Sequence, residues 1–268
     1  MSTINTNVNS LNAQRNLAGS ANTLASAMSR LSSGLRVNSA KDDAAGLGIA
    51  ERMNTQTRGM NVAIRNSNDA ISLAQTAEGA LGAISNNLQR MRELAVQASN
   101  GTNTTADVAS LDTEFKLLAA ENTRVAAATT FNGTAVIAAA TFTFQVGANS
   151  TAATDQIAVT ATSFSGTSST LGSATSTAFA EISKLDADIN TVSTARATWG
   201  ATQNRFDSVI TNLRVGSENS AAARGRIMDA DYAMETASLS RAQVLQQAGT
   251  AMVAQANQGP QSVLALLR

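Results

Sequence analysis

The stretch "AEGALGAISNNLQRMRELAVQAS", residues 77–99, repeats apolar side chains along one helix face. Alternate steps of four and three residues separate Ala77, Leu81, Ile84, Leu88, Met91, Ala95 and Ala98. This spacing is typical of a helix that packs lengthwise against other helices. Because no proline interrupts residues 44–99, we expect one helix from near Ala44 to about Ser99, about 80 Å long at about 1.5 Å per residue. The sequence therefore predicts an elongated, mainly α fold, an antiparallel helical rod or coiled-coil bundle.

Further helices are predicted on both sides of this stretch. The N-terminal segment repeats the same rhythm at Leu17, Ala21, Leu24, Met28, Leu31 and Leu35. Ser39 with Asp42, and Thr104 with Asp107, have the spacing of capping boxes, so we expect helices to begin near Ala44 and after Thr104, the latter ending about Ala128. Helical spacing returns from about 177 to 213, through Phe179, Ile182, Leu185, Ile189 and Val192. After "RVGSENSAAARG" (214–225), a final amphipathic stretch reaches Pro260 and carries Ile227, Met234, Leu245, Ala248 and Met252.

A small β region interrupts the helices. Apolar and polar residues alternate in "TFTFQV" (141–146) and in "DQIAVTAT" (155–162), as in half-buried strands. We therefore expect a β-hairpin within about 131–162. Residues 163–176 are rich in Ser, Thr and Gly, and we expect an exposed loop there. Residues 130–176 leave no room for an additional domain of the usual size, about 50 residues or more.

Composition argues against most catalytic chemistry. The chain has no cysteine and no histidine, which excludes disulfides, thiol catalysis and histidine metal sites. Its 19 basic and 19 acidic residues balance, so nothing favours nucleic-acid binding. No apolar run approaches the about 20 residues of a membrane span, and the start lacks the features of a secretory signal. We expect no enzyme, no cofactor, no metal, no nucleic-acid partner and no membrane insertion.

The remaining chemical motifs are weak. Gly46 and Gly48 lack the third glycine and the preceding strand of a dinucleotide fingerprint, so helix packing is favoured. The acids Asp229, Asp231 and Glu235 suggest either a cation site or, the favoured interpretation, acids at a helix N-terminus. Asp186 and Asp188 are two residues apart on a helix and do not face each other. This spacing argues against an acid/base pair.

The aromatic residues divide the chain into two parts. All seven Phe residues and the single Trp lie between positions 115 and 206. The central region can therefore build a core, and we expect a rod-like helical domain over 45–224. The ends carry amphipathic helices without large aromatic anchors, and we expect 1–44 and 225–268 to form a second domain whose helices pair as a coaxial coiled coil. Docking of these ends on the central rod remains an alternative, and membrane-surface binding is a weaker one because 242–267 contain no basic residue.

A single copy covers the stripes on the terminal helices poorly. We therefore expect them to form an assembly seam, comprising Leu17, Leu24, Met28, Leu31, Leu35, Leu245, Met252, Val263, Leu264, Leu266 and Leu267.

Long motifs in both halves resemble bacterial flagellin. They are "RLSSGLRVNSAKDDAAGLGIAERM" (30–53), "GALGAISNNLQRMRELAVQASNGTN" (79–103), "FNG" (131–133), "FQVGAN" (144–149), "ATQNRFDSVITNL" (201–213) and "SRAQVLQQAGTAMVAQANQ" (240–258). The resemblance implies a secreted subunit of the extracellular flagellar filament, serving motility, in a short form without large outer domains. It also implies that the terminal helices form the inner filament core and are disordered in the monomer.

The resemblance implies partners as well. They are further copies of the chain, the flagellar type III export apparatus, an export chaperone, the filament cap and the hook-junction proteins. A hook-to-filament junction protein is a close variant of this hypothesis, and a soluble coiled-coil adaptor is the alternative from another class. O-linked glycans on 162–177 are a further suggestion of the resemblance, but a plain solvated loop is favoured.

The resemblance also implies recognition by the vertebrate innate receptor Toll-like receptor 5. In this sequence the matching positions are Gln89, Arg90, Glu93, Leu94 and Glu114. Met91, Asn122 and Thr123 depart from the residues usual in the family. A contact between subunits is the alternative role for this patch.

Overall fold

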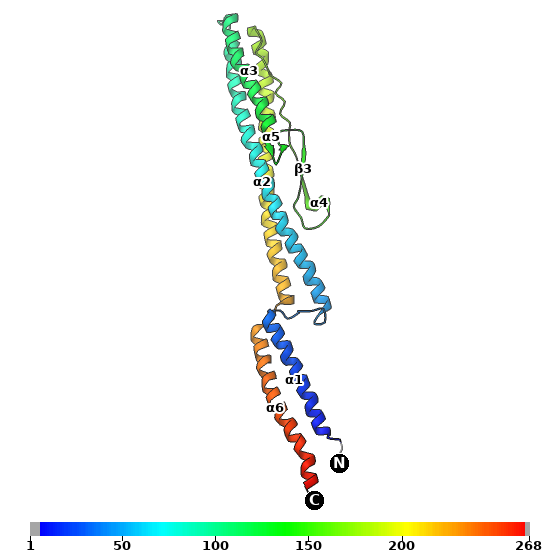
Figure 1. The fold of residues 1–268 in the computed structure, drawn as a ribbon. Helices are drawn as coiled ribbons and strands as arrows, with labels where there is room; N and C mark the ends of the chain where they lie inside the picture. Colours follow the sequence, from blue (N-terminus) through cyan, green and yellow to red (C-terminus); the bar gives the residue numbers. More distant parts are fainter. Residues whose placement is uncertain (1–5, 266–268) are drawn as a thin grey trace. The chain divides into compact units, whose positions relative to one another are not determined.

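The computed structural model describes residues 6–265, with side chains as far as 258. In chain order the elements are α1 (Val8–Ser33), α2 (Ala44–Ala98), α3 (Thr105–Ala128), β1 (Thr130–Phe131), β2 (Thr134–Ala135), β3 (Thr141–Gln145), α4 (Ala152–Asp155), β4 (Gln156–Thr160), α5 (Thr175–Met228) and α6 (Tyr232–Ala265) (Figure 1). The predicted class, mainly helical with a small β region and paired terminal helices, is confirmed.

The chain forms two compact units. One, the central unit, is Gln56–Glu218, and the other, the terminal unit, contains the residues up to Thr55 together with those from Asn219 onward. In the central unit α2, α3 and α5 lie side by side (Figure 1). Every residue of the 77–98 stripe is at most 2% exposed, and Phe115 and Phe206 are fully buried with it. The stripe is therefore the spine of the main core, as its spacing predicted.

On α5 the buried line differs from the predicted one. It runs through Ala178, Glu181, Leu185, Asp188, Val192, Ala195 and Trp199, all at most 9% exposed. Phe179, expected on the packed face, is 70% exposed. The difference arises because two acids, Glu181 and Asp188, occupy buried positions on α5. A prediction based on apolar periodicity expects only apolar side chains at such positions.

The helix ends confirm one predicted cap and correct another. Thr104 and Asp107 form the expected capping box at the start of α3. The prediction of a Ser39–Asp42 capping box is wrong. The Asp42 carboxylate instead accepts hydrogen bonds from the backbone N–H groups of Asn38 and Ser39 and closes a turn. Asp43 Oδ1 instead accepts from the Gly46 N–H at 2.8 Å, satisfying a donor in the first turn of α2.

The boundary between the last two helices also differs from the expectation. Helix α5 continues through 214–225 to Met228, so Ile227 belongs to α5. A glycine inside a helix costs only about 1 kcal/mol, and Gly216 and Gly225 do not end this one. Asp231 Oδ1 accepts from the N–H groups of Ala233 and Met234 and begins α6. Helix α6 passes Pro260 and ends at Ala265, although proline donates no backbone hydrogen bond.

Two hairpins lie in the β region. The predicted one pairs β3 with β4 antiparallel, placing Phe142 opposite Val159. The Phe144 ring packs edge-on against Phe206 of α5, with the ring centres 5.5 Å apart. The second hairpin, β1 with β2, turns at Asn132 and Gly133, which have φ of 49° and 78°. It was not predicted, although Asn-Gly is the typical sequence of this turn.

Residues 164–171 form an extended segment, here named the strap. The segment 163–176 was expected to be an exposed loop, and many of its residues are exposed. Ser168 and Leu171, however, are 4% and 0% exposed. Most of the strap is thus exposed, whereas Ser168 and Leu171 are buried and Phe164 is half-buried against the main core.

In the terminal unit α1 and α6 run antiparallel side by side (Figure 1). A small cluster of Val37, Ala50 and Met228 is buried in the same unit. A β-bridge between Leu35 and Asp229 ties the segments that follow α1 and α5.

Candidate assembly and recognition surfaces

The contact between α1 and α6 is built from two matching repeats. On α1 the residues at alternate steps of three and four are buried or half-buried: Ser10, Ala13, Leu17, Ser20, Leu24, Ala27 and Leu31. On α6 the corresponding residues are Glu235, Leu239, Ala242, Gln246, Gly249, Val253 and Ala256. Each set has the seven-residue period of a coiled coil. We name the two sets together the intrachain seam.

Polar bonds fix the register of the intrachain seam. The Asn7 amide donates to the Ala256 carbonyl at 2.7 Å, and Ser10 Oγ lies 2.8 Å from Asn257 Oδ1. At the other end, Arg30 forms an ion pair with Glu235 at 3.1 Å. These contacts pair the start of α1 with the distal part of α6 and the end of α1 with its beginning.

Small residues occupy the closest points of the intrachain seam. Ala27 and Ala242 are 3% and 2% exposed, and a Cβ placed on Gly249 would lie 3.0 Å from Leu17 Cδ1. The two helices therefore approach each other closely. The sequence analysis missed these positions because it considered only the large apolar residues. The sequence does contain a pattern that indicates them, because Ala242, Gly249 and Ala256 recur at intervals of seven residues.

The predicted assembly seam separates into two groups. Leu17, Leu24, Leu31 and Leu35 are half-buried within the chain. Met28, Leu245 and Met252 remain 56%, 52% and 59% exposed. Val263, Leu264, Leu266 and Leu267 lie outside the residues whose side chains the structure describes.

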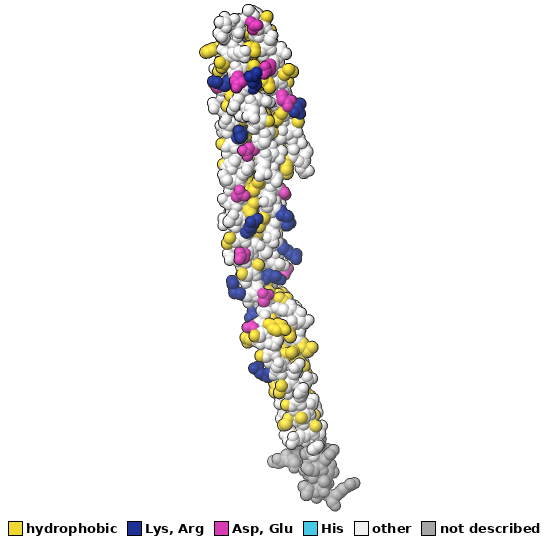
Figure 2. All heavy atoms as spheres, turned by 90° about the vertical axis from the view of Figure 1, so that its left-hand side faces the viewer, with side chains coloured by type: hydrophobic (Ala, Val, Ile, Leu, Met, Phe, Trp, Pro, Cys, Tyr) yellow, Lys and Arg dark blue, Asp and Glu magenta, His cyan; other side chains and the backbone are white. Residues whose placement is uncertain are grey.

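An open groove of about 1000 Å³ follows the two terminal helices. Helix α1 contributes mainly polar side chains, including Asn9, Asn12 and Asn16, and α6 contributes Leu245, Ala248 and Met252. Figure 2 shows hydrophobic side chains on the surface of the terminal unit. Exposed apolar area of this kind favours burial by another chain.

The predicted recognition patch is organised by Arg90. Its guanidinium lies 3.0 Å from the Glu93 carboxylate on the same helix and 2.9 Å from that of Glu114 on α3. Hydrogen bonds from Arg90 to Glu114 and then to Glu93 raise the pKa of Arg90. Gln89, Arg90, Glu93 and Glu114 are all solvent-exposed.

Leu94 lies beneath this patch. It is 1% exposed and belongs to the main core. The resemblance grouped it with the surface residues, but the structure assigns its side chain to the packing of α2. Nearby, the departing residue Asn122 is buried and accepts a hydrogen bond from the Asn87 amide at 2.9 Å.

Four of the five acids considered as chemical candidates have structural partners. Asp231 caps α6 and Glu235 pairs with Arg30. Asp186 pairs with Arg92 at 2.7 Å, whereas Asp188 binds Thr167. Among the described residues no three Asp, Glu, Cys or His side chains gather as a metal site would require. Within the same residues, no helix combines the length and apolarity needed to cross a membrane.

Comparison with known proteins identifies the family. Residues 4–141 match the model of the bacterial flagellin N-terminal helical region, and residues 182–267 match that of the C-terminal helical region. This chain belongs to the bacterial flagellin family. Flagellins are structural subunits of the flagellar filament, a helical polymer that drives motility, and the chain has this function.

Full-length relatives and a solved structure agree with this assignment. The chain is 46% identical over 271 residues to a flagellin of Halalkalibacterium halodurans, covering 99% of both proteins. It is 42% identical over 311 residues to a flagellin of Xenorhabdus nematophila, covering 100% of this chain and 99% of the relative. The crystal structure of Bacillus cereus flagellin is similar with a TM-score of 0.50 and 39% identity, covering 60% of this chain and 94% of that chain. The length match fits a short flagellin.

Proposed function

We propose that this flagellin polymerises through the terminal unit, with the large apolar residues outside the intrachain seam buried by neighbouring copies. The observation that carries the proposal is that the small and the large apolar residues of α6 lie on different faces of the helix. Ala242 and Gly249 face α1, while Leu245 and Met252 stay exposed in the groove. Repeated heterologous contacts of this kind form an open helical polymer rather than a closed ring.

Assembly also offsets the entropy of ordering the terminal helices. Fixing the backbone of one residue costs about 1–2 kcal/mol, and α1 and α6 bury few large side chains within the chain. We therefore propose that the terminal helices are disordered in the unassembled chain and order when neighbours cover Met28, Leu245 and Met252.

The test is polymerisation of the full chain after salting-out, followed by pelleting. The double variant Leu245→Ser/Met252→Ser is expected to stay soluble, while the matched control Gln243→Ser, an exposed change on the same helix, pellets like the parent. Equal pelleting of the double variant would refute the proposed contact surface. A parent chain that stops at a small oligomer would instead favour a soluble coiled-coil adaptor.

We further propose that the protein acts outside the cell as part of the filament. Its partners would be the flagellar export apparatus, an export chaperone, the filament cap and the hook-junction proteins. No enzymatic activity, cofactor or nucleic-acid partner forms part of this function. The relatives named above are flagellins, which favours a filament subunit over a junction protein.

Recognition by Toll-like receptor 5 is proposed for the patch around Arg90. Arg90, Glu93 and Glu114 present a connected charged surface across α2 and α3, and Leu94 supports it from below. In a receptor reporter assay Arg90→Asp is expected to lower signalling. Arg124→Asp is the matched control, because Arg124 is an exposed arginine that pairs with Glu121 on α3. Equal signalling by Arg90→Asp and the parent would remove the proposal.

A further inference from the structure

Three carboxylates anchor the strap to the helices of the central unit. From α5, the two oxygens of Asp188 accept from the backbone N–H of Thr167 at 3.0 Å and from its hydroxyl at 2.9 Å. Also from α5, Glu181 accepts from the Ser168 hydroxyl. From α3, Asp112 Oδ1 accepts from the Thr170 hydroxyl and the Leu171 N–H, both at 2.8 Å.

These carboxylates are buried, and two of the three have a lysine beside them. Asp112, Glu181 and Asp188 are 8%, 9% and 6% exposed. Lys116 on α3 lies 2.6 Å from Asp112, and Lys184 on α5 lies 2.5 Å from Glu181. On α2 the cation facing α5 is Arg92, and it pairs with Asp186 rather than Asp188. Asp188 therefore depends on the strap for its hydrogen bonds.

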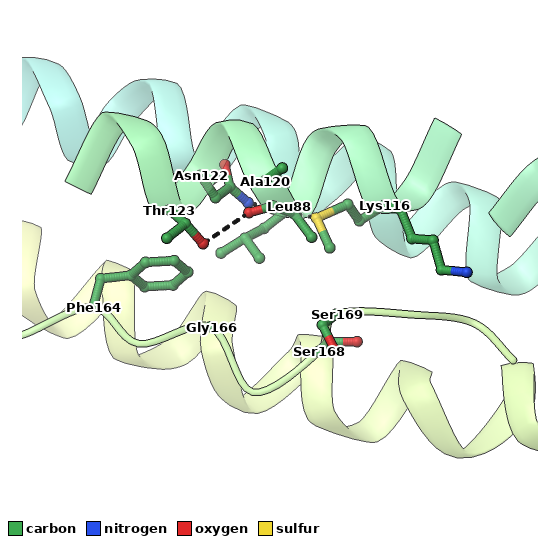
Figure 3. Close-up of a pocket in the computed structure, with 11 residues that line it drawn as sticks. Leu88, Lys116, Ala120, Asn122, Thr123, Phe164, Gly166, Ser168 and Ser169 are labelled. Atoms are coloured by element: carbon green, nitrogen blue, oxygen red, sulfur yellow. Dashed lines mark hydrogen bonds between the residues drawn. The ribbon is translucent and has the colours of Figure 1, made fainter. Parts of the chain in front are cut away.

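The strap covers apolar surface between the helices. A cavity of about 270 Å³ lies between it and α2 and α3, lined by Leu88, Met91 and Ala119 on the helices and by Phe164 and Ser168 on the strap. Figure 3 shows the strap passing between α3 and α5, with the Phe164 ring directed toward Thr123 and Leu88. Leu171 is completely buried in the main core. Release of the strap would expose part of this core.

We propose that the strap is a clasp released by acid, which detaches from α3 and α5 when Asp112, Glu181 and Asp188 are protonated while the three helices stay packed. All hydrogen bonds between the strap and the helices, among the described residues, end on these carboxylates. Protonation removes the negative charge that strengthens each bond. It also ends the ion pairs with Lys116 and Lys184.

The expected pH range follows from Asp112. Burial opposes its charged form, but hydrogen bonds from Lys116, Thr170 and the Leu171 N–H outweigh burial and hold its pKa below the ordinary value of 3.8. A lowered pKa stabilises the fold above that ordinary value, and the contribution is lost as the pH falls through the pKa of the folded state. Asp112 therefore holds its bonds to the strap at neutral pH and loses their charge-dependent strength only in acid, below its ordinary value of 3.8.

The strap falls between the two matched regions, 4–141 and 182–267. Of its anchors, Asp112 lies in the first region, Asp188 lies in the second, and Glu181 lies one residue before the second. The clasp therefore joins the connecting segment to both matched regions, and it does not depend on the proposed assembly surface.

Amide hydrogen exchange of the unpolymerised full-length chain at neutral pH tests the proposal. The triple variant Asp112→Asn/Glu181→Gln/Asp188→Asn keeps the side-chain shapes and removes the charges. We expect exchange in peptides covering 164–172 to accelerate at least about tenfold, as for loss of roughly 1.4 kcal/mol of protection. Peptides covering 77–98 of α2 should keep the parent rate. Asp186→Asn is the matched control, because this acid on α5 pairs with Arg92 rather than with the strap.

Two further hydrogen-exchange measurements complete the test, one on the parent in acid and one on a single variant. In the parent, strap exchange corrected for the intrinsic rate should rise as the pH falls below about 4, before the α2 peptides lose protection. If the triple variant does not fold, Asp188→Asn alone should accelerate exchange at Thr167. Unchanged strap protection in the variants, or loss of strap and α2 protection together in acid, would overturn the proposal.

Discussion

Gly249 of α6 lies against Leu17 of α1 so closely that an added Cβ would stand 3.0 Å from Leu17 Cδ1. We predict that Gly249→Val weakens the pairing of these helices by about 1–3 kcal/mol through overpacking. In the polymerisation assay this loss would raise the concentration needed for filaments. Gly19→Val on α1 is the control, because its Cβ would meet no atom within 4 Å. Equal filament yields from the two variants would show that close approach at Gly249 is unimportant.

Phe206 and Phe179 provide a matched pair of aromatic residues on one helix. Phe206 is fully buried and touches Phe144, whereas Phe179 is 70% exposed. Phe206→Ala is expected to lower the free energy of unfolding by about 3–5 kcal/mol, and Phe179→Ala to change it by less than about 0.5 kcal/mol. Denaturant unfolding measures both. A similar loss in the two variants would contradict the assigned faces of α5.

The capping box at the start of α3 gives a third prediction. Replacing Thr104 with Ala removes the acceptor for the Asp107 N–H and should cost about 0.5–2 kcal/mol of stability. Ser110→Ala, an exposed change within α3, is the control. Thermal unfolding with no difference between the two variants would show that the cap is not stabilising.

The same cap predicts a pH dependence. Hydrogen bonds from the Thr104 hydroxyl and then the Thr104 N–H lower the pKa of Asp107 from its ordinary value of 3.8. The cap's stabilising effect is therefore present above this value and declines as the pH falls through the folded-state pKa. The stability difference between the parent and Asp107→Asn should accordingly shrink on acidification below about pH 4. A difference that stays constant from neutral pH to about pH 2 would contradict this assignment.

The end of the chain provides a prediction about assembly alone. Removing residues 261–268 deletes Val263, Leu264, Leu266 and Leu267, which were expected to take part in the assembly seam. We predict that the shortened chain does not polymerise while the central unit keeps its circular dichroism signal. Normal filaments from the shortened chain would refute a role for these residues.

Sequence periodicity predicted those elements whose apolar spacing is continuous. The 77–98 stripe is buried throughout, and α2 and α3 have nearly the predicted limits. Periodicity failed on α5, where Glu181 and Asp188 occupy buried positions because the strap supplies their hydrogen-bond donors. Such tertiary compensation cannot be found by counting apolar residues within a single helix.

The terminal helices show a second limit of the sequence. Large residues such as Leu245 and Met252 drew attention to one face of α6, whereas Ala242 and Gly249 form the intrachain contact. Small residues carry a weak apolar signal, and their role depends on how closely the partner helix approaches. The proposed recognition patch, by contrast, could be suggested only through the resemblance, because its residues are ordinary for an exposed helix face.

The most direct test of the central claim is the labelling rate of a single thiol at position 252. The chain contains no cysteine, so Met252→Cys introduces a unique probe at a side chain that is 59% exposed in one chain. We predict rapid labelling of the unpolymerised protein and strong protection in the filament. Equal labelling rates in both states would mean that neighbouring copies do not cover this face, and would contradict the account of assembly.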